Sequence, residues 1–123
     1  MEKSLTLDEN IFLLAQKEQI NIKYPLLWNK ILQKIIFTFI KNNEIEKIRK
    51  LLDNDNNFIN VKDINFKTPL YNACYNSNFE IATTLLDNGA ELDRETFKLC
   101  QENEISKRNT AFWNKLVSKN INN

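Results

Sequence analysis

The sequence predicts an all-α protein built from short, paired helices. In the stretch from Asp63 to Asp93, Thr68 and Pro69 favour a helix start. A threonine hydroxyl can accept a hydrogen bond from an unpaired backbone N–H, and proline is tolerated in the first helical turn. Gly89, the single glycine of the chain, favours a helix end because glycine readily takes the left-handed conformation that closes a helix. Two short antiparallel helices followed by an extended segment are therefore expected in this stretch.

Each of these two helices has one apolar face. The first follows Pro69 and places Leu70, Ala73 and Cys74 on the same side. Ser77 and Asn78 are expected to break it and to cap the second helix. The second helix is expected from Phe79 to Asp87, with an apolar stripe of Phe79, Ala82, Leu85 and Leu86.

The stretch 63–93 resembles an ankyrin repeat. It contains TPLYNAC and then FEIATTLLDNGAELD, which follow the family pattern D-x-x-G-x-T-P-L-H-x-A-A-x-x-G-x-x-E-[IV]-[VA]-x-x-L-L-x-x-G-A-x-[VL]-[ND] in register and without a gap. Phe66 replaces the turn glycine of this pattern, Tyr71 the histidine, and Ser77 the glycine between the helices. The resemblance implies a helical solenoid with neighbouring repeats, because one repeat cannot bury its own apolar face.

The upstream part of the chain is expected to supply such neighbours. Residues 1–24 should hold one helix with a capping box at Thr6 to Glu9 and a linker from Ile20 to Tyr24. A second helix is expected from Leu26 to Lys41, and a third is expected after Asn43 to Glu46, which should cap it. The residues expected to face the core are Ile11, Phe12, Leu14 and Ala15 in the first helix, Trp28, Ile31, Leu32, Ile35, Ile36, Phe39 and Ile40 in the second, and Ile45, Ile48, Leu51 and Leu52 in the third.

The downstream part is expected to form a third repeat with a shortened hairpin. An inner helix is predicted near Glu95 to Glu102, and Asn103 should cap an outer helix from about Ile105 to Lys119. Phe112, Trp113, Leu116 and Val117 should close the core. The whole chain is thus predicted to be a single domain (1–123), a short ankyrin-type helical solenoid of about seven helices. Its parts are an N-terminal capping helix (1–24), a modified first repeat (25–62), a full repeat (63–93) and a C-terminal capping repeat (94–119).

The composition argues against several classes of function. The chain has 123 residues, a net charge of +1 and no histidine, so histidine-based catalysis and imidazole metal sites are excluded. A single glycine excludes a glycine-rich phosphate loop. We expect no catalytic residue, no cofactor and no metal site, and no binding to nucleic acid or membrane. The two cysteines, Cys74 and Cys100, are expected to be buried reduced thiols, with a disulfide or a reactive thiol as the alternative.

The polar N-terminal segment and the short apolar run from Ile31 to Ile40 predict neither a signal peptide nor a membrane span. A cytoplasmic location is therefore expected.

The resemblance also implies where a partner protein would bind. Ankyrin domains usually engage partners with their hairpin tips and the exposed side of their inner helices. Carried over to this chain, the hairpin residues are Ile64, Asn65, Phe66 and Lys67. The inner-helix ends are Lys41 and Asn42, Tyr75 and Asn76, and Gln101 and Glu102. As alternatives, Tyr75 is a partly exposed residue of no consequence and Phe66 folds back onto a neighbouring loop.

The predicted function is a non-catalytic protein-interaction module that binds and masks one partner protein. An immunity protein that inhibits a toxin would fit, from a bacterium whose AT-rich genome explains the asparagine content. The alternatives are an effector that engages a host protein, and a structural module that pairs with a second copy through its ends. Self-pairing predicts an exposed Trp28 or Trp113. The chain would otherwise be a monomer or a heterodimer with its partner.

Overall fold

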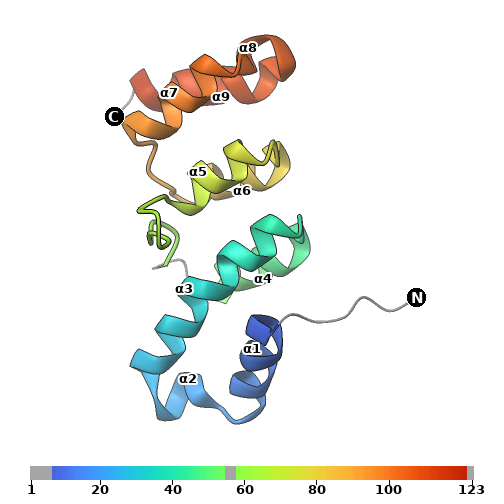
Figure 1. The fold of residues 1–123 in the computed structure, drawn as a ribbon, viewed down its shortest axis with the longest axis vertical. Coiled ribbons are helices and arrows are strands. Elements are labelled where there is room, and N and C mark those ends of the chain that lie inside the picture. The colour runs from blue at the N-terminus through green and yellow to red at the C-terminus, as the bar shows by residue number, and fades with distance from the viewer. Residues whose placement is uncertain (1–6, 55–57, 122–123) are drawn as a thin grey trace, which may run out of the picture.

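The protein is a stack of helices that extends along one long axis from the N-terminal to the C-terminal end (Figure 1). The computed structural model describes residues 7–54 and 58–121, which form helices and no strand. The prediction of an all-α helical solenoid is confirmed. The nine helices of the described residues are α1 (Leu7–Lys17), α2 (Ile20–Lys23), α3 (Pro25–Lys41), α4 (Ile45–Asn54), α5 (Pro69–Tyr75), α6 (Phe79–Asp87), α7 (Arg94–Glu102), α8 (Ile105–Arg108) and α9 (Thr110–Ile121).

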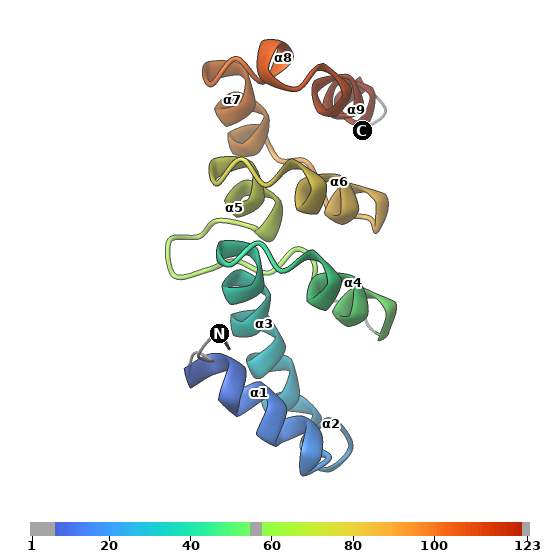
Figure 2. The ribbon, with the colours of Figure 1, turned by 90° about the vertical axis from the view of Figure 1, so that its right-hand side faces the viewer.

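The helices form two columns (Figure 2). The inner column consists of α3, α5 and α7, in which each helix packs against the next. The outer column consists of α4, α6 and α9, with α6 packed against both of its neighbours. The loop between α4 and α5 projects from the side of the inner column, away from the outer helices (Figure 2). Its described part, residues 58–68, is called the finger below.

The local signals in the sequence act as predicted at the start of α5 and the end of α6, and Asp93 adds a cap at the start of α7. The Thr68 hydroxyl accepts a hydrogen bond from the Tyr71 N–H at 3.1 Å, and Pro69 is the first residue of α5. At the start of α7, the Asp93 carboxylate accepts from the Thr96 N–H at 2.8 Å. Gly89 follows α6 with a φ of +95°, in the left-handed region that glycine adopts without strain.

One continuous hydrophobic core runs through the stack from Phe12 to Leu116. The predicted inward faces of α3, α4, α5 and α6 supply most of it, and Leu85 at its centre is fully buried. Cys74 and Cys100 are buried free thiols, as predicted. The hydrogen bond with the Cys100 thiol, together with burial, raises the pKa of the Cys74 thiol, which keeps this group protonated and unreactive.

The first helix buries a narrower face than the sequence predicts. Phe12 and Ala15 are buried, but Ile11 and Leu14 are exposed. Phe12 stacks on Trp28 with ring centroids 5.4 Å apart and meets the edge of Phe39 at 5.9 Å. Because α1 lies at the end of the stack and packs mainly on α3, its neighbours leave Ile11 and Leu14 uncovered. Thr6, and with it the predicted capping box, lies outside the described residues.

The two helices beyond the predicted seven come from segments where the sequence analysis was wrong. Residues 20–23, expected as a linker, form α2. The single predicted outer helix after Asn103 is divided at Asn109 into α8 and α9. Asn109 leaves the helical conformation, and its side-chain oxygen accepts from the Phe112 N–H at 3.0 Å, as an N-cap does.

Two asparagines predicted as helix caps have other roles. Asn103 ends α7 and donates its amide to the Leu99 carbonyl at 2.8 Å. Asn78 donates its side-chain amide to the Ile40 carbonyl at 2.7 Å. This second bond connects the turn after α5 to the end of α3. It therefore joins two neighbouring units of the stack instead of closing a helix start.

Across residues 7–54 and 58–121, no helix combines the length and apolar character needed to cross a membrane. The same residues contain no group of three or more Cys, Asp or Glu side chains arranged to hold a metal ion.

Candidate interaction surface

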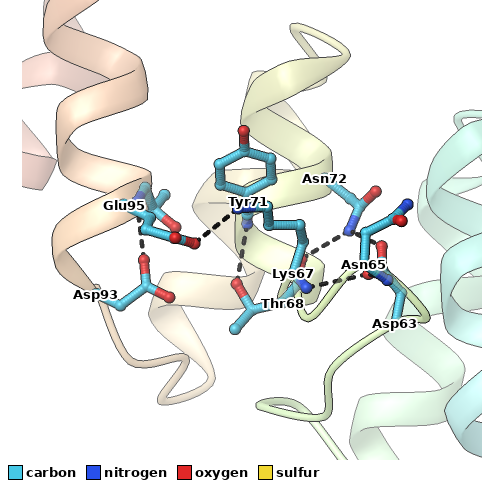
Figure 3. A network of polar contacts seen from close by, with 9 residues as sticks. Asp63, Asn65, Lys67, Thr68, Tyr71, Asn72, Asp93 and Glu95 are labelled. Carbon is cyan, nitrogen blue, oxygen red and sulfur yellow. Dashed lines mark hydrogen bonds and ion pairs between the residues drawn. The ribbon is translucent and has the colours of Figure 1, made fainter.

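The finger is folded around the side chain of Asp63 (Figure 3). Its carboxylate accepts hydrogen bonds from the backbone N–H groups of Asn65 at 2.8 Å and Lys67 at 3.0 Å. It also accepts from the side-chain amide of Asn72 at 3.0 Å. Two backbone hydrogen bonds of 2.9 Å close the turn. The Asp63 N–H donates to the Lys67 carbonyl, and the Phe66 N–H donates to the Asp63 carbonyl. The finger therefore has a defined backbone and is tied to α5.

These contacts also set the charge of Asp63. Partial burial on its own would raise the pKa of this carboxyl, but the hydrogen bonds from Lys67, Asn72 and Asn65 favour the ionised form more strongly. The net effect lowers the pKa of Asp63 below its ordinary value of 3.8. The sequence offered a signal for this role, since Asp63 occupies the aspartate position of the ankyrin pattern, yet it was not among the predicted site residues.

The far end of the finger presents apolar side chains to solvent. Ile64 is 92% exposed and Phe66 is 77% exposed. Phe66 has a φ of +63°, so it holds the left-handed turn that the family pattern assigns to glycine. Its ring does not fold back into the protein.

Lys67 connects the finger to the next inner helix (Figure 3). Its ammonium group donates to Glu95 on α7 at 2.9 Å and lies 4.9 Å from the centroid of the Tyr71 ring. The hydrogen bond with Glu95 raises the pKa of Lys67. Tyr71 in turn stacks on Tyr75, with ring centroids 6.3 Å apart. Tyr71 therefore belongs to the surface between the finger and the helix ends, and its place at the histidine position of the pattern was the signal for it.

The other predicted residues lie at the C-terminal ends of the inner helices. This group is exposed except for Asn42, which is half-buried. Because α5 has seven residues and is about 10 Å long, it separates this group from the finger. The ten predicted residues thus form two groups at opposite ends of α5, the finger residues Ile64, Asn65, Phe66 and Lys67, and the helix-end residues Lys41, Asn42, Tyr75, Asn76, Gln101 and Glu102.

A groove of about 730 Å³ lies beside the finger and between α1 and α3. We call it the α1–α3 groove. Lys41 and Ile64 are the predicted residues that line it. Its other lining residues were missed because the groove depends on how α1 packs on α3, which no local pattern specifies. They are Asp8, Ile11, Leu27, Lys30, Ile31, Gln33, Lys34, Phe37, Thr38, Lys62 and Asp63.

Comparison with known proteins identifies relatives over much of the chain. The family model of ankyrin repeats (three copies) matches residues 8–96, which is more than half of the sequence. The chain is 39% identical over 54 residues to an acyl-CoA-binding domain-containing protein 6 homolog of Dictyostelium discoideum, and 36% identical over 64 residues to the ankyrin repeat protein FPV018 of fowlpox virus (strain NVSL). An ankyrin repeat protein of Rickettsia felis (strain ATCC VR-1525 / URRWXCal2) is 31% identical over 88 residues.

These matches cover 44%, 51% and 71% of this chain, respectively, but only 19%, 9% and 27% of the three relatives. No solved structure shows a significant match. The family match starts in α1 and extends to the first turn of α7, so it includes the finger and the inner helices α3 and α5. The chain belongs to the ankyrin repeat family.

Proposed function

We propose that this chain binds one partner protein through its finger and the exposed ends of its inner helices, and that it blocks the partner by covering its surface. Ankyrin repeats indicate a protein-interaction module, and such domains are generally non-catalytic. One observation carries the proposal. Ile64 and Phe66 are exposed on a loop whose backbone is already fixed by Asp63. Apolar side chains on a preorganised loop lose little entropy when a partner covers them, so they favour tight binding.

A specific form of this function is an immunity protein that masks a toxin in the bacterial cytoplasm. Such a protein acts by covering the surface of the toxin. It therefore needs a rigid contact face but no catalytic group. The second candidate is an effector that engages a host protein, and the matches to proteins of a poxvirus and of Rickettsia felis favour it.

Self-pairing through the ends of the stack is less well supported. That alternative requires an exposed Trp28 or Trp113. Both are half-buried, and Trp113 stacks on Phe97 with ring centroids 5.5 Å apart.

The test is affinity capture with the purified chain from lysate of the organism that encodes it. Wild type is compared with a Phe66→Ala, Tyr75→Ala variant and with a control variant, Tyr24→Ala, Leu26→Ala, which removes exposed side chains that belong neither to the finger nor to the helix-end residues. We expect wild type and control to retain one protein at near-stoichiometric yield and the Phe66, Tyr75 variant to lose it. The activity of the captured protein then distinguishes a toxin from a host factor. Equal retention by all three folded proteins would disprove binding through this surface.

A further inference from the structure

We propose that the α1–α3 groove binds an acidic, amphipathic helical segment of the partner protein. This inference rests on the proposed function and names the chemistry of the bound segment. It extends the contact surface beyond the finger and the inner-helix ends, onto α1 and along α3 from Leu27 to Lys41.

The apolar part of the groove lining comes from three separate elements. Ile11 of α1 is 43% exposed, Leu27 of α3 is 49% exposed, and Ile64 of the finger is almost fully exposed. Ile31 and Phe37 of α3 also line the groove and are half-buried. A hollow of about 730 Å³ lies within the range of sites that enclose a ligand group, and it is large enough for a few apolar side chains.

The rim of the groove is basic. Lys30, Lys34 and Lys41 of α3 and Lys62 of the finger line it. Among the described residues, no carboxylate forms an ion pair with any of these four lysines. Five lysines elsewhere, Lys47, Lys67, Lys98, Lys107 and Lys115, are paired with carboxylates, whereas Lys17, Lys23, Lys50 and Lys119 are isolated from one another along the chain. The groove therefore gathers four lysines that form no ion pair with a described carboxylate.

The two carboxylates that line the groove are already engaged. Asp8 accepts a hydrogen bond from the Thr38 hydroxyl at 3.5 Å. Asp63 accepts the three bonds that shape the finger. Four lysines outnumber these two carboxylates in the lining, so the groove has a formal charge of +2 and attracts a negatively charged segment.

The arrangement along α3 favours a segment that is both acidic and apolar. Leu27 and Ile31 are one helical turn apart, as are Lys30 and Lys34, so an apolar stripe and a basic stripe run side by side along α3. A helix with an apolar row flanked by Asp and Glu complements both stripes. Nucleic acid would leave the apolar part of the lining uncovered, and a flat membrane surface does not fit into a groove.

The experiment uses synthetic peptides of about 15 residues, titrated against the full chain by amide NMR. One peptide is an amphipathic helix of Glu and Leu. In a second peptide Lys replaces Glu, and in a third Ser replaces Leu. We expect the Glu/Leu peptide alone to shift resonances of α1, α3 and the finger, with an affinity that falls as salt is added. The proposal is overturned if the Glu/Leu peptide leaves the groove unshifted or if either of the other two binds equally well.

Charge-reversed variants locate the site. Lys30→Glu, Lys34→Glu should weaken binding of the Glu/Leu peptide at least about tenfold, because two attractions become repulsions. The matched control, Lys17→Glu, Lys23→Glu, makes the same change in net charge at exposed positions outside the groove. It should change the affinity less than about twofold. Equal weakening by both variants would indicate a general charge effect and would rule out the groove as the site.

A final comparison separates this inference from the proposed function. The partner identified by affinity capture is purified, and its binding to two double variants is measured. These are Phe66→Ala, Tyr75→Ala and Lys30→Glu, Lys34→Glu. Loss of binding in Phe66→Ala, Tyr75→Ala with none in Lys30→Glu, Lys34→Glu would leave the proposed function standing and overturn the groove. Stronger binding of phosphatidylserine vesicles or duplex DNA than of the Glu/Leu peptide would also overturn it in favour of a membrane or nucleic acid.

Discussion

Some non-glycine residues of this protein have a left-handed backbone conformation at positions where the family pattern has glycine. Phe66 and Ser77 occupy glycine positions of the ankyrin pattern, and their φ angles are +63° and +58°. Asn43 and Glu104 have the same left-handed conformation in the turns after α3 and α7. Each costs a non-glycine residue about 1–2 kcal/mol. The turns are thus dictated by the packing of the helices around them and not by the residues within them.

This strain predicts that Ser77→Gly stabilises the protein. Relief of the left-handed strain exceeds the extra chain entropy of glycine, so the free energy of unfolding should rise by about 0.5–1 kcal/mol. The matched control is Ser118→Gly within α9, where glycine lowers helix stability and should cost about 0.5 kcal/mol. Urea denaturation of both variants measures the changes. A loss of stability in Ser77→Gly would mean that the Ser77 hydroxyl, which accepts from Arg108 at 3.0 Å, matters more than the strain.

The Asp63 carboxylate predicts a pH dependence. Because its pKa is lower in the folded protein than its ordinary value of 3.8, the ionised group stabilises the fold. This contribution is fully present above the ordinary pKa and is lost as the pH falls through the lower folded-state pKa. Asp63→Asn should therefore be less stable than wild type at about pH 7, and the difference should shrink strongly by about pH 2. Urea titrations at both pH values measure it, and an unchanged difference would show that the charge of Asp63 has no role.

At the scale of helices, the sequence predicted the elements with strong end signals. Thr68 marks the start of α5 and Gly89 the end of α6, as expected. The break at Asn109 was missed because an asparagine inside an apolar pattern is as compatible with a continuous helix as with a helix end. The prediction of the buried face of α1 was partly wrong. This face depends on the helix that α1 contacts, and local periodicity carries no information about that contact.

The candidate surface was likewise predictable only in part. The finger residues follow from the repeat motif, since the pattern fixes where the loop between helices must project. The α1–α3 groove could not be predicted, because its apolar lining comes from Ile11, Leu27 and Ile64, which are far apart in the sequence. The packing of both α1 and α5 on α3 brings them to one place.

The buried face of α6 predicts the cost of losing its central contact. Leu85 is completely buried, so Leu85→Ala should lower the free energy of unfolding by about 2–5 kcal/mol. The control is Leu26→Ala, the same substitution at a residue that is 80% exposed, which should change stability by less than about 0.5 kcal/mol. Urea denaturation followed by circular dichroism gives both values. A cost below about 1 kcal/mol for Leu85→Ala would contradict the packing of α6.

At the scale of the whole molecule, the stack is too short for its parts to be independent. Each helix pair buries its apolar face against the next, and one hydrophobic cluster connects α1 to α9. In a solenoid, stability is the sum of weak units and favourable interfaces between neighbours. Contacts such as Asn78 to Ile40, Arg49 to Glu80 and Lys115 to Asp87 cross these interfaces. Loss of one unit therefore exposes the faces of its neighbours.

This coupling predicts that both ends unfold together. Trp28 packs on Phe12 near one end and Trp113 on Phe97 near the other, so each tryptophan reports on its own end. In Trp28→Phe and Trp113→Phe, the fluorescence of the remaining tryptophan should follow the same urea transition as the circular dichroism of that variant, because every described helix except α2 contributes to one core. A fluorescence transition at lower urea than the loss of helix, in either variant, would show that this end separates first and that the core is divided into independent units.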